Sequence, residues 1–556
     1  MIETFKQSLK RHLETKLEIE NLIIEEPKRG HADLAIPLFA FAKEWSKKIQ
    51  EVYTLFEQEM MDEKGIDRIE LLNGFLNIYL NRSYFAYPII DEILDLGSDY
   101  GTKSPNNETV VMDYSSPNIA KSFGVGHLRS TMIGNALKQI YKKCGYEVIG
   151  VNHIGDWGTQ FGKMIVAYEL WGNDEAIKQD PIAELQKLYV RFHDAESSEP
   201  ELEDKAREVF SALEQGNEKY FKLWTWFKEE SLREFMDMYD LLGVSFDSFH
   251  GEAFYNDKMD QVIKELEDKK LLKVDEGATI VELPFDLPPA LIKKSDGATL
   301  YITRDLAAVM YRHNTYHTNH ILYVVGNEQQ LHFKQLKALT DLMGYDFNIE
   351  HVNFGLVLID GKKMSTRGGK FKRLEDVITQ AISDAKKAIL EKNPNLKNQD
   401  EVARAVGIGA IIFNDLKNER HLDVDFNLDN MLKFEGMTGP YLQYSSVRIA
   451  SILREETLVK DKIDSSYYHE DAYFEVIKLL AQFPHIIMRA KDNNAPNLIA
   501  RYITTLAQSF NSFYAQQRLL VDEEGHKQAN LHFIKAIQTV INEGLRILGI
   551  TALEEM

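Results

Sequence analysis

Cysteine is almost absent from this 556-residue chain, since Cys144 is the only one. A single cysteine excludes a disulfide within the chain and any zinc site with two or more cysteine ligands. Long hydrophobic runs are also missing, because no apolar segment reaches the length of a membrane span. The N-terminal segment MIETFKQSLKRHLETKL is charged and amphipathic and lacks the apolar centre of a signal peptide. We therefore expect a cytoplasmic protein without a membrane partner.

Positive charge is scarce as well. The chain has 65 Lys and Arg against 86 Asp and Glu, and its formal net charge is -21. Taken alone, this balance argues against a nucleic-acid partner, which usually needs a basic surface. However, residues 360–373, DGKKMSTRGGKFKR, carry six basic residues and one acid, whereas residues 194–204, DAESSEPELED, carry six acids and no base. The basic segment is therefore a candidate phosphate site.

The length predicts about three domains. Residues 1–105 indicate a small unit with an N-terminal helix, a turn and second helix over residues 30–45, and strand-like alternation over residues 69–81. A βα pattern follows, with a strand at residues 109–114, a helix that ends at the candidate C-cap Gly145, and a strand and loop at residues 147–158. This order predicts a right-handed parallel crossover.

Helical patterns dominate two later regions. Residues from about 163 to 242 are helical and highly charged, which indicates an insertion. Helical periodicity also dominates from residue 373 to the end. Between these regions we expect four strands, at residues 279–283, 299–305, 320–326 and 351–359.

In residues 115–137 a strand-to-helix junction combines Pro117, Asn118, Lys121, Gly124, Gly126 and His127. The N-terminus of a helix attracts anions through its free N–H groups and its dipole. Gly124 and Gly126 would let a nucleotide approach the backbone, and Lys121 and His127 would donate to phosphate oxygens. Alone, the string GVGH is also typical of a glycine-rich turn with a capping histidine.

A second segment, GKKMSTRGGKF at residues 361–371, follows a predicted strand. Its Lys362, Lys363, Arg367 and Lys370 would suit a polyphosphate whose charge shifts during a reaction. Alone, it is equally typical of a solvated basic loop.

Together, the two segments resemble the HIGH and KMSKS signatures of class I aminoacyl-tRNA synthetases. Further segments resemble the arginyl-tRNA synthetase family, in that family's order, over essentially the whole chain. These segments are SSPNIAK, GHLRST, NHIGDWGTQFG, LYITRDLAA, VVGNEQQLHFKQL, KKMSTRGGK and TGPYLQYSSVRIASILR. The resemblance implies ATP-dependent ligation of L-arginine to its tRNA through an arginyl-adenylate, with release of AMP and pyrophosphate.

The resemblance also implies the fold. We expect an α/β protein whose catalytic domain is a Rossmann-like parallel sheet, with a small α+β N-terminal domain and an all-α C-terminal helical bundle. The boundaries would be residues 1–105 for a domain that binds the tRNA corner, 106–430 for the catalytic domain with its insertion, and 431–556 for the anticodon-binding domain. The partners would be L-arginine and its tRNA, and the protein would be a monomer.

Recognition of arginine requires carboxylates and planar acceptors, because a guanidinium is a planar fork of donors. The positions that match the family's arginine contacts are Asp113, Asn118, Tyr301, Asp305 and Gln329. Asp113 and Asp305 would pair with the charged ends of the substrate, and Tyr301 would pack on its aliphatic stem. Each acid alone is also typical of a helix cap or a surface charge.

Recognition of ATP would use both signature segments. The matching positions are Gly124, Gly126, His127, His332, Lys363, Met364 and Ser365. His127 and Gly126 would lie at phosphate and ribose, Lys363 would hold the leaving pyrophosphate, and His332 would border the adenosine. Mg²⁺ is expected with ATP but needs few protein ligands, so we assign no metal-ligating residue. Catalysis would come from positioning and electrostatics, with Lys121, His127 and Lys363 as the catalytic residues.

Two positions depart from the signatures. Gly124 stands where the HIGH signature begins with His, and the loss of one such phosphate donor typically costs a few kcal/mol. Thr366 stands at the second Lys of KMSKS, and Lys121 is the family's apparent replacement. Gly124 leaves open an RNA-binding protein derived from a synthetase that has lost activation. A class I synthetase for another amino acid, with lysine nearest in charge, is a third alternative.

Contacts to tRNA are expected outside the catalytic domain. In the N-terminal unit the matching positions are Asn73, Phe75 and Asn77; in the C-terminal helices they are Tyr441, Tyr444, Arg448, Tyr514 and Met556. Exposed aromatic residues serve as stacking platforms for unpaired bases. Aromatic residues in a helical bundle are as often core residues, and the N-terminal positions could equally pack a strand.

Overall fold

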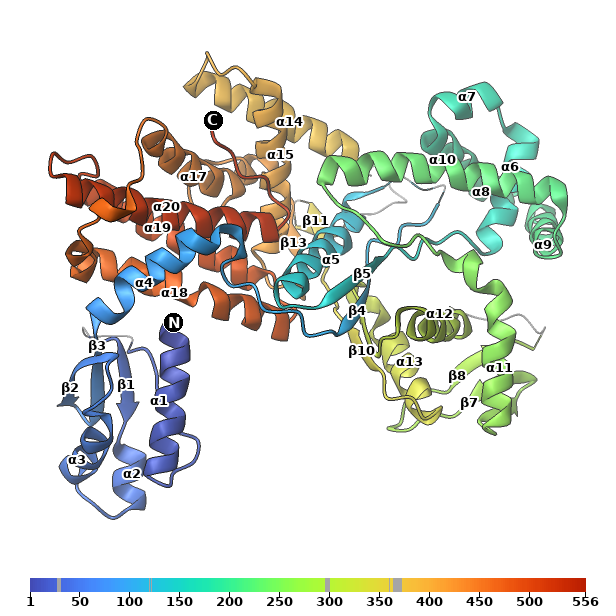
Figure 1. The fold of residues 1–556 in the computed structure, drawn as a ribbon. Coiled ribbons are helices and arrows are strands. Elements are labelled where there is room, and N and C mark those ends of the chain that lie inside the picture. The colour runs from blue at the N-terminus through green and yellow to red at the C-terminus, as the bar shows by residue number, and fades with distance from the viewer. Residues whose placement is uncertain (28–31, 120, 122, 296–300, 360, 364–372) are drawn as a thin grey trace.

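The computed structural model of the chain shows an α+β unit at the N-terminus, a parallel sheet flanked by helices, and a C-terminal helical bundle (Figure 1). It describes all residues except 28–31, 120, 122, 296–300, 360 and 364–372. Within these limits, none of the helices is both long enough and apolar enough to span a bilayer.

The N-terminal unit is an antiparallel three-stranded sheet covered by helices. Its elements are α1 (Ile2–Lys16), β1 (Leu34–Pro37), α2 (Phe39–Glu44), α3 (Ile49–Met60), β2 (Ile66–Leu72) and β3 (Phe75–Leu80), and the strand order is β1-β3-β2. The turn and second helix predicted over residues 30–45 are wrong at Leu34–Pro37, which forms β1. This strand pairs Leu34 with Ile78 and Ile36 with Leu76. A continuous apolar run carries no period, so only this long-range pairing decides its conformation.

The central sheet confirms the predicted Rossmann-like parallel arrangement. Its strands are β4 (Thr109–Asp113), β5 (Glu147–Val151), β9 (His320–Tyr323) and β10 (Asn348–His351), all parallel in the order β10-β9-β4-β5. Helix α5 (Val125–Lys143) connects β4 to β5. Val110 and Met112 face the core that contains α5, whereas Val111 faces the core of α12 and α13. Both faces of the sheet are therefore covered, as expected for parallel strands.

Helix α12 corrects one prediction. The strand expected at residues 299–305 is wrong where the structure describes it, because Tyr301–Tyr316 forms α12. Ile302, Leu306 and Val309 are buried at helical spacing, and Thr303 donates a hydrogen bond to the Ile292 carbonyl. β-branched and aromatic residues favoured a strand, but the apolar period continues as a helix.

Around α12 lie the remaining elements of this half of the molecule. They are η2 (Glu252–Lys258), α11 (Met259–Asp268), an antiparallel sheet of β6 (Leu272–Asp275), β7 (Ala278–Val281) and β8 (Ala290–Lys293), η3 (Asn327–Gln329) and α13 (Gln330–Leu342). Strand β7 confirms the strand predicted at residues 279–283 to within its ends.

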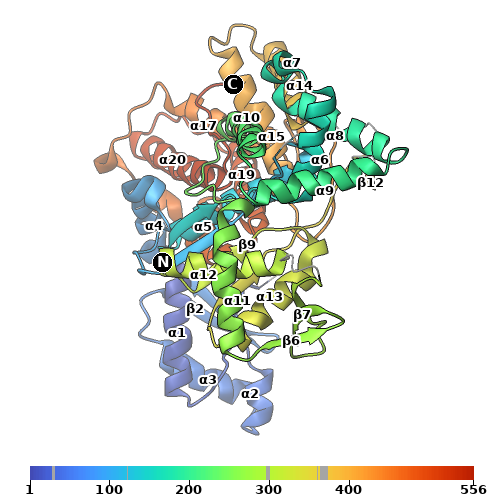
Figure 2. The ribbon, with the colours of Figure 1, turned by 90° about the vertical axis from the view of Figure 1, so that its right-hand side faces the viewer.

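The residues at which the sequence predicts an insertion are helical. They form α6 (Thr159–Trp171), α7 (Asp174–Gln179), α8 (Pro181–Glu196), α9 (Glu201–Glu214) and α10 (Glu218–Leu242). The insertion and the N-terminal unit lie at opposite ends of the molecule (Figures 1 and 2).

The strand predicted at residues 351–359 is two strands in two sheets. After β10, strand β11 (Val357–Ile359) pairs antiparallel with β12 (Lys362–Lys363) and parallel with β13 (Val424–Asp425). Gly355 separates β10 from β11, and a Cβ atom there would lie 2.5 Å from the Leu422 carbonyl. This close backbone approach forces the chain out of the first sheet.

The C-terminal part is helical, as predicted. Its helices are α14 (Leu374–Lys392), α15 (Gln399–Leu416), α16 (Leu428–Met431), α17 (Gly439–Leu453), α18 (Asp471–Asp492), α19 (Asn497–Gln516) and α20 (Glu524–Ile547), with short 3-10 turns at Lys460–Lys462 and Ser465–His469. Helix α4 (Arg82–Leu96), followed by a 3-10 turn at Gly97–Asp99, packs against α18 and α20 although it follows the N-terminal unit in sequence (Figure 1). The α/β fold class expected from the sequence is confirmed.

Candidate functional site

Asp113 ends β4 at the carboxyl edge of the parallel sheet, where ligands of such sheets usually bind. Its Oδ2 accepts a hydrogen bond from Arg312 Nη2 at 2.6 Å, and its Oδ1 accepts one from the Ser116 hydroxyl at 2.9 Å. Asp113 and Arg312 are both buried. The first acid predicted for arginine binding is therefore already engaged by a cation of the chain itself.

Arg312 was missed by the sequence reasoning. Burial lowers the pKa of its guanidinium, but Asp113 and nearby tyrosines outweigh this and hold the pKa well above its ordinary value. Arg312 lies seven residues after Asp305 on α12, which is two helical turns. The spacing would have indicated a shared face, had the segment been predicted as a helix.

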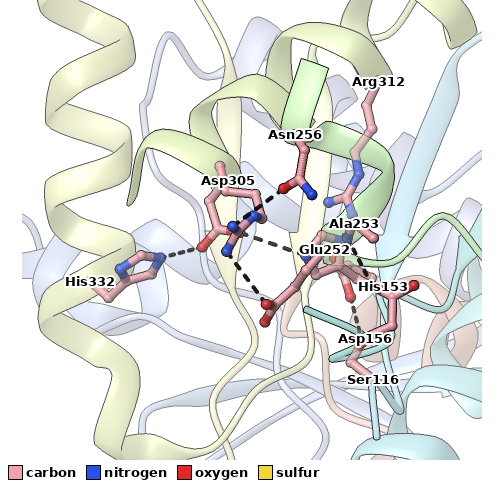
Figure 3. A network of polar contacts seen from close by, with 11 residues as sticks. Ser116, His153, Asp156, Glu252, Ala253, Asn256, Asp305, Arg312 and His332 are labelled. Atoms are coloured by element: carbon pink, nitrogen blue, oxygen red, sulfur yellow. Dashed lines mark hydrogen bonds and ion pairs between the residues drawn. The ribbon is translucent and has the colours of Figure 1, made fainter. Parts of the chain in front are cut away.

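Asp305, the second predicted acid, lies close to two histidines (Figure 3). Its Oδ2 is 2.5 Å from His332 Nε2, and its Oδ1 is 3.9 Å from His153 Nε2. Burial raises the pKa of Asp305, but the hydrogen bond from His332 and the nearby cations outweigh it, so the net pKa is lowered. The structure thus brings His332, expected at the adenosine, to the predicted arginine site.

Glu252 is a third carboxylate in this region, and the sequence reasoning missed it. Arg304 Nη1 lies 3.4 Å from its Oε2, and Figure 3 shows the Glu252 side chain beside Asp305 and His153. Burial raises the pKa of Glu252 to about 7; Arg304 opposes this, and Asp305 and Asp156 reinforce it. No string in the sequence distinguishes this acid from a surface glutamate. Only the fold of η2 brings it to the sheet edge.

The predicted phosphate segment begins helix α5. Gly124 is the N-cap, and its N–H donates to His127 Nδ1 at 3.1 Å while the His127 N–H donates to the Gly124 carbonyl at 2.9 Å. Since Nδ1 accepts, the ring proton is assigned to Nε2. Burial, together with Lys121, lowers the pKa of His127 to about 4, so the ring is neutral near pH 7.

Lys121 and Gly126 flank this cap. Burial lowers the pKa of Lys121, whose ammonium lies 5.7 Å from the ring centre of Tyr189 on α8. Gly126 is exposed, and a Cβ atom there would meet no atom of the protein within 4 Å. The fold itself therefore does not require a glycine at this position.

The end of the basic segment contacts the first signature segment. Gly124 forms an antiparallel bridge with Arg373, the last residue of the basic segment 360–373, and Leu374 N donates to the Phe123 carbonyl at 3.1 Å. Near the start of the basic segment, the backbone of Lys363 in β12 pairs with Leu358 of β11. Met364 and Ser365 lie outside the described residues.

The other predicted arginine contacts lie at segment ends. Asn118 bridges to Gly155, Tyr301 is the first residue of α12 and is 64% exposed, and Gln329 is an exposed residue at the end of η3.

In the C-terminal part, two of the predicted residues line one cavity. Tyr444 and Met556 line a cavity of about 270 Å³ together with Ile389, Lys392, Asn393 and Phe434. The Lys392 ammonium lies 4.2 Å from the ring centre of Phe434 and 5.6 Å from that of Tyr444. Lys392 and Phe434 are contributions that the sequence reasoning did not include.

Arg448 joins two of the predicted aromatic residues. Its guanidinium carbon lies 5.1 Å from the ring centre of Tyr444 and 5.4 Å from that of Tyr514, which is 40% exposed. The Tyr441 hydroxyl instead accepts a hydrogen bond from Asn511 at 2.9 Å. Tyr444, Arg448 and Tyr514 thus form one partly exposed cluster, whereas Tyr441 is held against α19.

In the N-terminal unit, Asn73 and Gly74 form the hairpin turn between β2 and β3, both with positive φ. Phe75 and Asn77 alternate along β3 with the buried Leu76 and Ile78. Period-2 alternation puts the two predicted residues on the face opposite the core.

Comparison with known proteins covers the whole chain. Residues 89–428 match the family model "tRNA synthetases class I (R), catalytic domain", residues 442–556 match "DALR anticodon binding domain", and residues 1–80 match "Arginyl tRNA synthetase N terminal domain". The arginine–tRNA ligase of an Exiguobacterium species is 50% identical over 99% of both chains. That of Enterococcus faecalis is 48% identical over 97% of this chain and 96% of its own.

Solved structures share the fold. The arginyl-tRNA synthetase of Thermus thermophilus matches with a TM-score of 0.84 at 23% identity and covers 100% of both chains. That of Plasmodium falciparum matches with a TM-score of 0.83 at 24% identity, over 100% of this chain and 99% of its own. At such identities these likenesses speak for the fold. The sequence matches over the full length carry the assignment, and by them this chain belongs to the class I arginyl-tRNA synthetase family.

Proposed function

We propose that this protein ligates L-arginine to its tRNA in an ATP-dependent reaction that proceeds through an arginyl-adenylate and releases AMP and pyrophosphate. The observation that carries the proposal is the bridge between Gly124 of the first signature segment and Arg373 at the end of the basic segment, in a chain of this family. A cluster of carboxylates at the end of the parallel sheet supplies the complementary chemistry for arginine.

The guanidinium of the substrate would bind between Asp305 and Glu252. Two carboxylates that approach from different elements can accept the fork of guanidinium donors. Asp113 already has a cation in Arg312, so its role toward arginine would be at the α-ammonium end, where its Oδ1 holds only the Ser116 hydroxyl. Asn118 and Gln329 would complete this end, and Tyr301 would cover the aliphatic stem.

ATP would bind where α5 begins. Gly126 leaves open space for the nucleotide, and His127 would donate its Nε2–H to a phosphate oxygen. Gly124 removes one phosphate donor of the signature, and the free N–H groups of the helix would compensate. Lys363, Met364 and Ser365 would hold the leaving pyrophosphate, and His332 would border the adenosine from its place beside Asp305.

The chemistry needs no covalent intermediate with the protein. The arginine carboxylate attacks the α-phosphate of ATP, pyrophosphate leaves, and the terminal adenosine of tRNA then takes the arginyl group. Lys121, His127 and Lys363 would stabilise the charge that develops on the phosphates. Among the described residues no cluster of three or more His, Cys, Asp or Glu could hold a metal. Mg²⁺ would be held mainly by ATP and water, because it needs few protein ligands.

The tRNA would be recognised by the N-terminal and the C-terminal parts of the chain. Asn73, Phe75 and Asn77 would contact its outer corner, with residues 1–105 as the corner-binding domain. Residues 106–430 would form the catalytic domain and 431–556 the anticodon-binding domain. In the latter, Tyr441, Tyr444, Arg448, Tyr514 and Met556 would contact anticodon bases, and the cavity of about 270 Å³ beside Tyr444 has a cation at its wall. We propose a cytoplasmic monomer.

A second candidate is an RNA-binding protein that no longer activates an amino acid, and Gly124 favours it. ATP–pyrophosphate exchange with arginine, with and without tRNA, separates the two. Exchange that depends on arginine supports the ligase, whereas tRNA binding without exchange supports the second candidate.

A further inference from the structure

Arg129 is a buried cation on α5, two residues after His127, and it has no part in the site described so far. Its side chain is 1% exposed. Its guanidinium makes four hydrogen bonds: Nε to Asp415 Oδ1 at 2.7 Å, Nη1 to the carbonyls of Gly355 and Leu422 at 2.8 Å each, and Nη2 to the Arg420 carbonyl at 3.2 Å. All three nitrogens donate hydrogen bonds, so this guanidinium connects several segments of the chain.

Two of the partners of Arg129 lie in the two segments of the chain that lead into strands β11 and β13. Gly355 lies two residues before β11, and Leu422 lies two residues before β13. Nη1 bonds both carbonyls at once, at the point where the two backbones approach so closely that a side chain at Gly355 would clash with Leu422. The guanidinium therefore fixes the relative position of these strands where they begin.

This sheet carries half of the proposed ATP site. Strand β11 pairs with β12, which contains Lys363, and the first residues of α5 carry Gly126 and His127. Arg129 joins the helix to the two segments that lead into this sheet. A displacement of its hydrogen bonds would change the distance between the α5 N-terminus and β12.

We propose that Arg129 is a positioning residue for adenylate formation, which holds the β11–β12 segment in register with the N-terminus of α5. The inference rests on the proposed function, because it concerns the same ATP site. Arg129 would touch no reacting atom and would act only through the placement of the groups that do.

The geometry requires arginine and not simply a positive charge. A planar guanidinium can serve a carboxylate and three carbonyls in different directions, whereas an ammonium is a point charge with three donors on one nitrogen. Asp415 compensates the charge. Burial raises the pKa of Asp415, Arg129 opposes this, and the carboxylate side chain is 6% exposed. Replacement by lysine would keep a cation but lose the fork.

The test compares Arg129→Lys with a matched control on the same helix. Lys138 is also buried on α5, where its Nζ lies 2.9 Å from Asp247 Oδ2 and donates to the Ser245 carbonyl at 3.0 Å. Lys138→Met therefore breaks a comparable ion pair remote from the β11–β13 sheet. Both full-length variants are assayed for ATP–pyrophosphate exchange with tRNA present, below the Tm of each, and tRNA binding is measured in parallel.

For Arg129→Lys we expect kcat of exchange to fall by about 100-fold, the typical effect of a displacement near 1 Å in a reacting geometry. The KM for arginine and the affinity for tRNA should not change. Lys138→Met should keep its kcat while its Tm falls. If Arg129→Lys fails to fold, Asp415→Asn is tested in its place, since it keeps an acceptor for Nε but removes the negative charge. In that variant kcat should fall by about tenfold, a smaller loss than in Arg129→Lys.

A kcat at the wild-type level in Arg129→Lys or, failing that variant, in Asp415→Asn would overturn the inference. An equal loss in Lys138→Met would also overturn it, because the effect would then be a general one of damage to α5. The unchanged protein in the same assay tests the proposed function separately, since absence of exchange there contradicts the ligase assignment and not the role of Arg129.

Discussion

Three carboxylates near the end of β4 differ in how the protein compensates their charge. Asp113 has Arg312, Asp305 has His332, and Glu252 has only Arg304 at 3.4 Å. The pKa of Glu252 is accordingly raised to about 7, mainly by burial. At the residue scale, Glu252 is thus the acid whose charge changes near neutral pH and whose ionisation a bound guanidinium would favour.

This difference predicts that arginine affinity depends on pH. The ionised form of Glu252 binds a guanidinium and protonation competes with it, so affinity should rise with pH through the pKa near 7. Between about pH 6 and about pH 8, Kd for arginine should fall about tenfold, as the ionised fraction of one such group rises. Calorimetry of arginine binding in the presence of tRNA measures it. Glu252→Gln should bind more weakly and lose most of this slope, and an unchanged slope in that variant would contradict the assignment.

Gly126 offers a second test, because the fold leaves room for a side chain there. Gly126→Ala should leave Tm unchanged or raise it, since alanine is favoured over glycine in a helix by up to about 1 kcal/mol. If ATP approaches this Cα, the added methyl should raise KM for ATP by about tenfold, a loss near 1.4 kcal/mol of binding. Steady-state exchange kinetics and a thermal melt check both halves. A KM for ATP equal to wild type would place the nucleotide elsewhere.

At the residue scale, functional residues that lie in short sequence motifs could be predicted from the sequence. Residues that the fold brings together from distant segments could not. His127 and Gly124 are neighbours in sequence, and the structure joins them in one cap. Arg312 and Glu252 reach the pocket from α12 and η2, and each looks like an ordinary surface charge in isolation. A long-range ion pair leaves no local pattern to be read.

At the scale of the elements, helix α10 of the insertion is linked to the carboxylate cluster through Asp156. Lys228 on α10 pairs with Asp156 at 2.6 Å, and the other oxygen of Asp156 accepts from Ala253 N at 2.8 Å, next to Glu252. Asp156 is fully buried, and Trp224 donates to its carbonyl. Helix α10 is thereby connected to the residue that we propose to bind arginine.

Loss of this ion pair should affect stability and arginine binding together. Lys228→Met leaves the Asp156 carboxylate buried with a backbone N–H partner but no cation, which should cost about 1–3 kcal/mol of stability. KM for arginine should rise because Ala253 and Glu252 shift, whereas KM for ATP should not. Chemical denaturation and exchange kinetics measure the two effects. The control is Lys219→Met, also on α10, which removes the ion pair of Lys219 with Glu169 of α6. This substitution should change neither the stability nor KM for arginine.

The predicted elements were correct where the apolar period was clear. The parallel strands β4, β5 and β9 and the insertion helices followed from alternation, compact apolar runs and helical spacing. Residues 34–37 and 301–305 were assigned to the wrong state, because short runs of apolar and β-branched residues fit both periods. Their conformation is decided by partners far away in sequence, β3 for the first and β8 with the core around α12 for the second.

At the scale of the whole molecule, an ion pair with a buried carboxylate connects the N-terminal unit to the helical bundle. Lys478 of α18 lies 2.7 Å from Asp33 Oδ1, and Asp33 Oδ2 accepts from Leu80 N at 2.9 Å. Beside it a cavity of about 1090 Å³ is lined by residues of the unit and of α18, and α1 packs against α18. The relative position of the two proposed tRNA-binding surfaces therefore depends in part on this ion pair.

Weakening this connection should reduce tRNA recognition without touching the chemistry. Lys478→Met leaves Asp33 without its cation, and KM for tRNA should rise by about tenfold if the pair contributes near 1.4 kcal/mol to the binding geometry. KM for arginine and for ATP should stay as in wild type. Lys460→Met removes an exposed pair with Asp91 and is the control, since such surface pairs contribute about 0–1 kcal/mol. Equal effects of the two substitutions would contradict this account.

The central claim is arginine activation by a chain whose HIGH-type signature begins with Gly124. ATP–pyrophosphate exchange tests it most directly, with arginine or lysine as the amino acid and with or without tRNA. We predict exchange with arginine and tRNA and none with lysine, which would also show that Gly124 is tolerated. Absence of exchange in every condition, with tRNA still bound, would contradict the ligase assignment and support the RNA-binding alternative.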